Sequence, residues 1–80
     1  MLAEEIEARG ISQRELARRM GRPFQVVNDV VRGRKAITPD TALSLEAILD
    51  GISADFWLKL QLEHDLVLAR ERRRTAAASA

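Results

Sequence analysis

The 80-residue chain lacks cysteine and tyrosine, and it has one histidine, one tryptophan and two phenylalanines. Without cysteine, neither a disulfide framework nor a thiolate metal site can form, which fits a reducing compartment. The lone His64 leaves no nucleophile–base pair and no His-rich metal site, so we expect no enzyme and no cofactor. No apolar run approaches the ~20 residues that span a bilayer, and no signal-peptide pattern opens the chain, which predicts a cytoplasmic protein.

Composition is that of one small globular domain. Hydrophobic residues make up 46% of the chain and charged residues 31%, which is typical of a folded protein. We expect a single domain over residues 1–70. Residues 71–80 have little to bury, and the sequence predicts that they form a disordered tail.

The net charge of +1 conceals a segregation along the chain. Residues 14–35 carry seven Lys or Arg against two acids, whereas residues 36–69 carry six acids against Lys59 alone. Residues 70–80 add four arginines against Glu71. A charge cluster of this kind is often only a solvated surface. Phosphate neutralisation is the alternative, and the motif described next favours it.

The positive block coincides with the segment Gln13–Arg32, QRELARRMGRPFQVVNDVVR. Ala17 is small where a second helix must pass closely, and Gly21 follows where the chain turns and φ is positive. Val27 and Val30 recur at the spacing of one helix face and can pack on the preceding helix. This combination predicts a DNA-reading helix-turn-helix motif over residues 13–32.

The remaining signals predict an all-α, five-helix fold with a longer C-terminal helix. The expected helices cover about 2–9, 13–20, 23–33, 39–50, and a longer segment that starts near residue 54. Ser12 with Glu15 is a capping box, and Thr38 and Ser53 are expected N-caps. Pro23 and Pro39 are each expected at the first position of a helix, where proline loses no hydrogen bond.

The outward face of the second motif helix is the expected base-reading surface. Gln25 and Asn28 offer the amide chemistry that pairs with adenine, and Phe24 and Val26 suit a thymine methyl. For Phe24, packing against the first helix or a loop is the alternative. Asp29 either accepts from cytosine or anchors Arg32 or Arg22, and we favour the arginine. The predicted base-contacting residues are Phe24, Gln25, Val26, Asn28 and Asp29.

Phosphate contacts are expected from residues that flank this face. Gln13 lies at the start of a helix, where free N–H groups also attract phosphate. The predicted phosphate-contacting residues are Gln13, Arg14, Arg32, Arg34 and Lys35. One of Arg18 and Arg19 is expected only to solvate the outer face of its helix.

The C-terminal helix has more apolar residues than one small core can cover. Phe56 and Leu60 are expected to face the core of the domain itself. A homodimer interface is then predicted among Trp57, Leu58, Leu62, Leu66 and Val67. The alternative is that the whole helix folds back onto the first and fourth helices.

The strings VVNDVVRGRKAITPDTALSLEAIL and ADFWLKLQLEHDL resemble HigA-type antitoxins of the VapI group, within the lambda-repressor-like XRE family. The resemblance covers about residues 3–70. It departs from the family at His64, where tyrosine is common, and in the shorter start MLAEEIEARG, which lacks an HPG-type lead-in.

The resemblance implies a homodimer that binds a palindromic operator on double-stranded DNA and represses its own operon. It also implies a protein partner, a RelE-like ribonuclease toxin of the HigB class that the antitoxin neutralises. Glu4, Glu5 and Glu7 form either a docking face for a basic toxin or a solvated helix start favoured by the helix dipole. A phage-type XRE regulator without a toxin is the alternative function.

Overall fold

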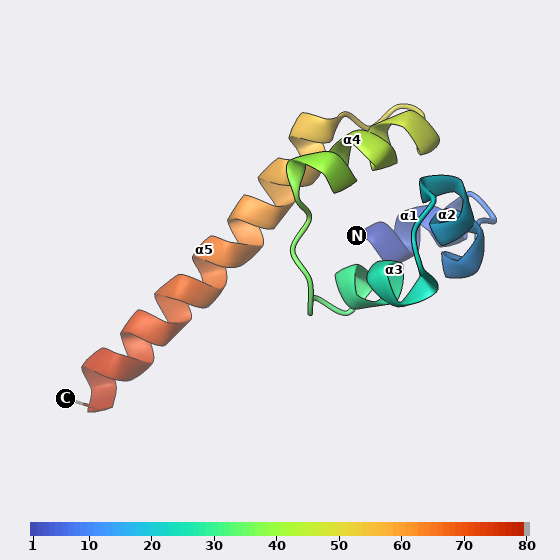
Figure 1. The fold of residues 1–80 in the computed structure, drawn as a ribbon. Coiled ribbons are helices and arrows are strands. Elements are labelled where there is room, and N and C mark those ends of the chain that lie inside the picture. The colour runs from blue at the N-terminus through green and yellow to red at the C-terminus, as the bar shows by residue number, and fades with distance from the viewer. Residues whose placement is uncertain (80) are drawn as a thin grey trace.

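Five α-helices make up most of the chain, and the computed structural model describes residues 1–79. The helices are α1 (Leu2–Ala8), α2 (Gln13–Met20), α3 (Phe24–Val31), α4 (Pro39–Ile48) and α5 (Ala54–Ser79). Figure 1 shows α1, α2 and α3 grouped together, with α4 above them and α5 projecting far beyond the group. The all-α class with a longer C-terminal helix is therefore confirmed. Within residues 1–79, no helix combines the length and apolarity that crossing a bilayer requires.

Polar caps set the starts of three helices, as the sequence predicts. The hydroxyls of Ser12, Thr38 and Ser53 each accept a hydrogen bond from the backbone N–H three residues later, at 3.0, 3.3 and 3.2 Å. Each bond satisfies one of the N–H groups that a helix start leaves unpaired. Pro39 is the first residue of α4, as expected. Pro23 is the N-cap of α3 and not its first residue, so α3 begins one residue later than predicted, at Phe24.

The core lies where α1, α2, α3, α4 and the start of α5 meet. Leu16, Leu45, Leu49 and Trp57 are fully buried, and Val27 is nearly so. The other buried apolar residues are Leu2, Ile6, Ala17, Ala42 and Ala54. Burial of this set among four short helices and the start of α5 holds the helix-turn-helix as one rigid unit.

The start of α5 is rotated relative to the sequence-based expectation. Trp57, predicted at a dimer interface, is fully buried in the core of the domain, whereas Phe56, predicted in the core, is 41% exposed. The two rings meet edge to face with centroids 6.1 Å apart. Trp57 is excluded from a dimer interface because a side chain with no exposed surface cannot touch a partner. Leu60 packs against the core as expected.

The end of α5 also differs from the expectation. The predicted disordered tail from residue 71 is helical through Ser79. Alanine and arginine are among the strongest helix formers, and no glycine or proline interrupts the segment. Glu71 and Arg74 add an i, i+3 ion pair at 3.4 Å. At about 1.5 Å per residue, α5 is roughly 39 Å long, and its second half extends past the rest of the domain.

Candidate nucleic-acid interface

The crossing of α2 and α3 is built from a small residue and a left-handed turn. Ala17 on α2 is buried, and Val27 on α3 is almost completely buried against the same core. Gly21 ends α2 with φ of +68°, a conformation in which a side chain is strained even though open space surrounds the position. The turn predicted at Gly21 is present, and Ala17 is buried, as a close helix approach requires. Together they fix α3 relative to α2.

The outward side of α3 carries an amide and a carboxylate that hold each other. Gln25 is exposed, and its Nε2 donates to Asp29 Oδ1 at 2.8 Å. Asp29 therefore engages Gln25, and the favoured prediction that it anchors an arginine is wrong. An amide NH₂ has two donors, so Gln25 keeps one N–H and its carbonyl oxygen. Those two groups are the pair that bidentate adenine recognition needs.

A second amide pair links the starts of the two motif helices. Asn28 Nδ2 donates to Gln13 Oε1 at 3.0 Å across a half-buried contact. The bond uses the acceptor of Gln13 and leaves its Nε2 donors available at the N-terminus of α2. Gln13 can therefore still donate to a phosphate, as predicted. Asn28 is held to α2, so its predicted contact with a base requires its remaining N–H and carbonyl oxygen.

Arg14 and Phe24 make a contact that sequence reasoning did not anticipate. The Arg14 guanidinium lies 4.6 Å from the centroid of the Phe24 ring, and Phe24 is half-buried. A cation–π contact of this kind orients the guanidinium at low entropic cost. The two residues are ten positions apart on different helices, so helical spacing alone gives no signal for it.

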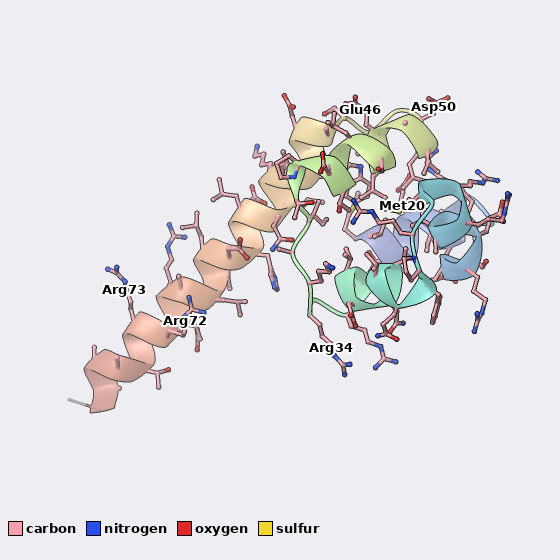
Figure 2. The ribbon with its side chains drawn as sticks, viewed as in Figure 1. Met20, Arg34, Glu46, Asp50, Arg72 and Arg73 are labelled. Atoms are coloured by element: carbon pink, nitrogen blue, oxygen red, sulfur yellow. The ribbon has the colours of Figure 1, made fainter. Side chains whose placement is uncertain are left out.

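The other predicted phosphate contacts lie in and beside the loop after α3. Arg32, Arg34 and Lys35 are exposed, and none of them pairs with a carboxylate in the part of the chain that the structure describes. The N–H groups of Arg34 and Lys35 both donate to the Asp29 carbonyl, at 2.8 and 3.2 Å. Figure 2 shows Arg34 extending away from the domain on the side opposite α4. These cations remain available for phosphate.

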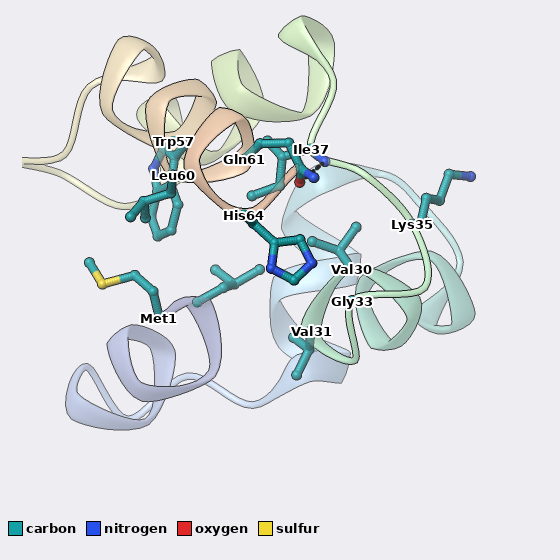
Figure 3. A pocket seen from close by; sticks show the side chains of 11 residues that line it. Met1, Val30, Val31, Gly33, Lys35, Ile37, Trp57, Leu60, Gln61 and His64 are labelled. Atoms are coloured by element: carbon teal, nitrogen blue, oxygen red, sulfur yellow. Dashed lines mark hydrogen bonds between the residues drawn. The ribbon is translucent and has the colours of Figure 1, made fainter. Parts of the chain in front are cut away.

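The same loop is tied to α5. Ile37 N donates to Gln61 Oε1 at 2.8 Å, drawn as a dashed line in Figure 3. Beneath this bond lies a hollow of about 190 Å³ between α5 and the end of α3, into which His64 points. It is lined mainly by apolar side chains, Val30, Val31 and Leu60 among them. The hydrogen bond fixes the loop that carries Arg34 and Lys35 relative to the helix predicted to dimerise.

Glu15 accepts hydrogen bonds from two arginines on the outer side of α2. Arg18 Nε donates to Glu15 Oε2 at 2.9 Å, and Arg19 Nε donates to Glu15 Oε1 at 3.0 Å. The capping box is therefore only half formed, because the Glu15 carboxylate turns to these arginines and not back to the Ser12 N–H. The hydrogen bond from Arg18, followed by that from Arg19, lowers the pKa of Glu15 from 4.5 to about 2.

The lowered pKa predicts how acid affects Glu15. A depressed pKa means that its ion pairs stabilise the fold above pH 4.5 and that this contribution disappears as the pH falls towards 2. We expect Glu15→Gln to be less stable than the wild type at pH 6, with the difference shrinking to nothing near pH 2. Urea midpoints of both proteins across this range measure the effect. The carboxylate is accessible to solvent, so the difference is small, and a gap that widens in acid contradicts the assignment.

The motif geometry and the unpaired cations beside it define a DNA-binding protein of the helix-turn-helix class. Residues 2–57 match the helix-turn-helix family HTH_3, and the chain belongs to this family, which is of the XRE type. The family assignment places it among helix-turn-helix DNA-binding proteins.

Two solved structures show which members of the family it resembles. The first is an addiction module antidote protein of the HigA family from Coxiella burnetii, with a TM-score of 0.83 and 33% identity. That match covers 94% of this chain and 82% of the other. The second is the Pseudomonas aeruginosa antitoxin HigA with the higBA promoter, with a TM-score of 0.82 and 34% identity over 92% of this chain and 79% of that one. The fold and family resemblance to HigA antitoxins is thus confirmed.

Two curated relatives from one organism also match the chain. Virulence-associated protein A of Dichelobacter nodosus is 31% identical over 61 residues, which are 76% of this chain and 60% of that protein. Virulence-associated protein I of the same organism is 34% identical over 68 residues, 85% of this chain and 62% of that protein. The chain spans about three fifths of the length of these relatives.

Proposed function

We propose that this protein is the antitoxin of a type II toxin–antitoxin pair and that it represses its own operon as a homodimer. The observation that carries the proposal is the likeness to an antitoxin HigA whose structure includes the higBA promoter, at 34% identity over 92% of this chain. The α3 face with Gln25, together with the unpaired Arg32, Arg34 and Lys35, supplies the chemistry for reading and holding an operator.

A homodimer follows from how little sequence one reading helix can contact. Specific sites for helix-turn-helix proteins usually contain two half-sites about one helical turn, ~34 Å, apart. Leu62, Leu66 and Val67 on α5 are 58%, 40% and 60% exposed, which is a costly arrangement for an isolated monomer. Leu58 is half-buried and borders them. These four residues of the predicted interface remain candidates for the contact between subunits.

A footprint on the DNA upstream of the gene tests the proposed reading residues. Gln25→Ala should lose roughly 1–3 kcal/mol of discrimination at one base position in each half-site, because Gln25 offers a paired donor and acceptor. On DNA that lacks the preferred adenine, Gln25→Ala and the wild type should bind with nearly the same affinity. Loss of affinity that is equal on every sequence contradicts a reading role for Gln25.

Arg34→Ala is the matched variant for a positioning role. It should weaken binding to specific and unrelated DNA alike and reduce the dependence of log K on log salt by about one phosphate contact. Titrations at several salt concentrations, on both kinds of DNA, measure this slope. If Gln25→Ala and Arg34→Ala behave identically, the division into readers and positioners is wrong.

The toxin is the second part of the proposal, and it is tested on the neighbouring gene. An adjacent reading frame for a small basic RelE-like protein should yield a toxic product when expressed alone and a stable complex when co-expressed with this chain. Co-purification and restored growth are the readouts. A locus without such a frame leaves the DNA-binding role intact and assigns the chain to XRE regulators without a toxin.

A further inference from the structure

One exposed stripe of α5 has a mirror arrangement about the level of His64. Leu62 and Leu66 lie two residues on either side of position 64. Asp55 and Arg73 lie nine residues on either side, and they are five turns apart at about 3.6 residues per turn, so they share one face with those leucines. We call this face the α5 stripe, and it contains Asp55, Leu58, Leu62, Leu66, Ala69 and Arg73.

The α5 stripe is unpaired at both charged ends. Asp55 and Arg73 are exposed, and neither forms an ion pair in the part of the chain that the structure describes. Figure 2 shows Arg73 extending outward from the projecting half of α5. The leucines between them are 58% and 40% exposed. The stripe thus has an apolar centre, an acid at one end and a base at the other.

We propose that a second copy of this chain covers the stripe in an antiparallel orientation, with the two-fold axis crossing α5 at the level of His64. Leu62 then meets Leu66 of the partner subunit, and Asp55 meets Arg73 of the partner subunit, at both ends of the contact. This inference rests on the proposed homodimer and specifies its geometry. A two-fold interface places each residue pair twice, so one complementary pair yields two ion pairs.

The charge pattern selects this orientation. Parallel α5 helices place Asp55 beside Asp55 of the partner subunit and Arg73 beside Arg73 of the partner subunit, and like charges at both ends repel. Antiparallel helices join opposite charges at both ends. The leucines alone do not discriminate, because they face one another in either arrangement. Orientation is therefore fixed by the charged ends, as in other helix pairs whose flanking charges choose the partner geometry.

Charge reversal tests the two ends. Arg73→Glu should weaken the dimer roughly tenfold at low salt, measured by sedimentation equilibrium, because two attractive pairs become repulsive. Arg72→Glu, the same change at an arginine on another face of α5 that forms no ion pair within residues 1–79, should leave the dimer constant unaltered. The double variant Asp55→Arg, Arg73→Glu should recover wild-type dimerisation, with circular dichroism verifying that it is folded. A double variant no better than Arg73→Glu overturns the proposal.

Cross-linking reads the orientation directly, because engineered thiols are the only ones in a chain without cysteine. In an equal mixture of Asp55→Cys and Arg73→Cys, a short bis-maleimide should join one protein to the other. A mixture of Asp55→Cys and Arg74→Cys should give far less product. Efficient cross-linking of Asp55→Cys to itself indicates parallel helices. That result overturns the antiparallel arrangement but leaves the homodimer intact.

Two further outcomes separate this inference from the proposed function. A wild-type protein that sediments as a monomer at micromolar concentration removes both the dimer and its geometry. A wild-type dimer in which Arg73→Glu lowers only operator affinity, with the dimer constant unchanged, assigns Arg73 to DNA phosphates and overturns the ion pair while the homodimer stands.

Discussion

Replacement of Leu62 with aspartate should give a folded protein that sediments as a monomer and binds its operator roughly 100-fold or more weakly than the wild type. Leu62 is 58% exposed in the single chain, so the domain itself has little to lose from the change. In the proposed dimer the new carboxylate is buried against Leu66 of the partner subunit. A buried, unpaired charge opposes association far more than a lost leucine contact does.

Weak operator binding follows from the loss of linkage between two half-sites. When one reading helix is bound, the second faces its half-site at a high effective concentration, and the pair binds far more tightly than either alone. A monomer retains only the single-site affinity. The measurements are sedimentation equilibrium for the subunit assembly and a gel-shift titration on the complete operator and on an isolated half-site. On the half-site, Leu62→Asp and the wild-type subunit should bind alike.

Leu43→Asp is the matched control for this experiment. Leu43 on α4 is 56% exposed, almost the same as Leu62, and it lies outside the proposed interface. It therefore controls for the general effect of replacing an exposed leucine with an acid. We expect a dimer with normal operator affinity. If Leu62→Asp remains dimeric, or if Leu43→Asp dissociates the protein equally well, the interface does not lie on this face of α5.

The helix-turn-helix was predictable because its signals are local. Ala17, Gly21 and the N-cap Ser12 each report a backbone requirement that a few neighbouring residues express. The same holds for Thr38 with Pro39 at the start of α4. Such features depend on steric limits and on unpaired N–H groups at helix ends, and both can be read from single positions. All five helix starts match the sequence-based expectation within one residue.

The side-chain contacts of the reading face were not predictable in the same way. Gln25 with Asp29 is an i, i+4 pair that helical spacing allows, but Arg22 and Arg32 are equally plausible partners for the carboxylate in the sequence. The Arg14–Phe24 and Gln13–Asn28 contacts join two helices. Their formation depends on the crossing geometry of α2 and α3, which residue spacing within either helix does not contain.

Residues 54–60 show where hydrophobic periodicity fails. Adjacent Phe56 and Trp57 are both large and apolar, and they are followed by leucines on several faces, so a helical wheel gives no unique buried side. The structure places Trp57 inward and Phe56 outward. Packing decides this choice, because the core left by α1, α2 and α4 accepts one large ring at that level.

The prediction of a disordered tail from residue 71 was wrong for a different reason. Strong helix formers extend a helix that is already nucleated.

Trp57→Ala should unfold the protein at or below physiological temperature. Trp57 has no exposed surface, and removal of a buried tryptophan typically costs about 3–5 kcal/mol. Small domains have total stabilities near the low end of about 5–15 kcal/mol, so this loss removes most or all of the margin. Thermal melts followed by circular dichroism measure it. Had Trp57 been an interface residue, the variant would be a folded monomer instead, and that outcome contradicts the core position.

Two further variants, Phe56→Ala and Trp57→Phe, test which features of the two rings stabilise the fold. Phe56 is 41% exposed, so its truncation should cost far less stability than that of Trp57, although the edge-to-face contact between the rings is lost.

The buried Trp57 Nε1 has no hydrogen-bond partner among the side chains and backbone around it. Trp57→Phe keeps an aromatic ring and removes this unpaired donor, whose desolvation costs about 1–3 kcal/mol. That gain offsets much of the cavity cost, so Trp57→Phe should melt close to the wild type. A melting point as low as that of Trp57→Ala would instead mean that the indole N–H is satisfied in solution and that the full volume of the ring is required.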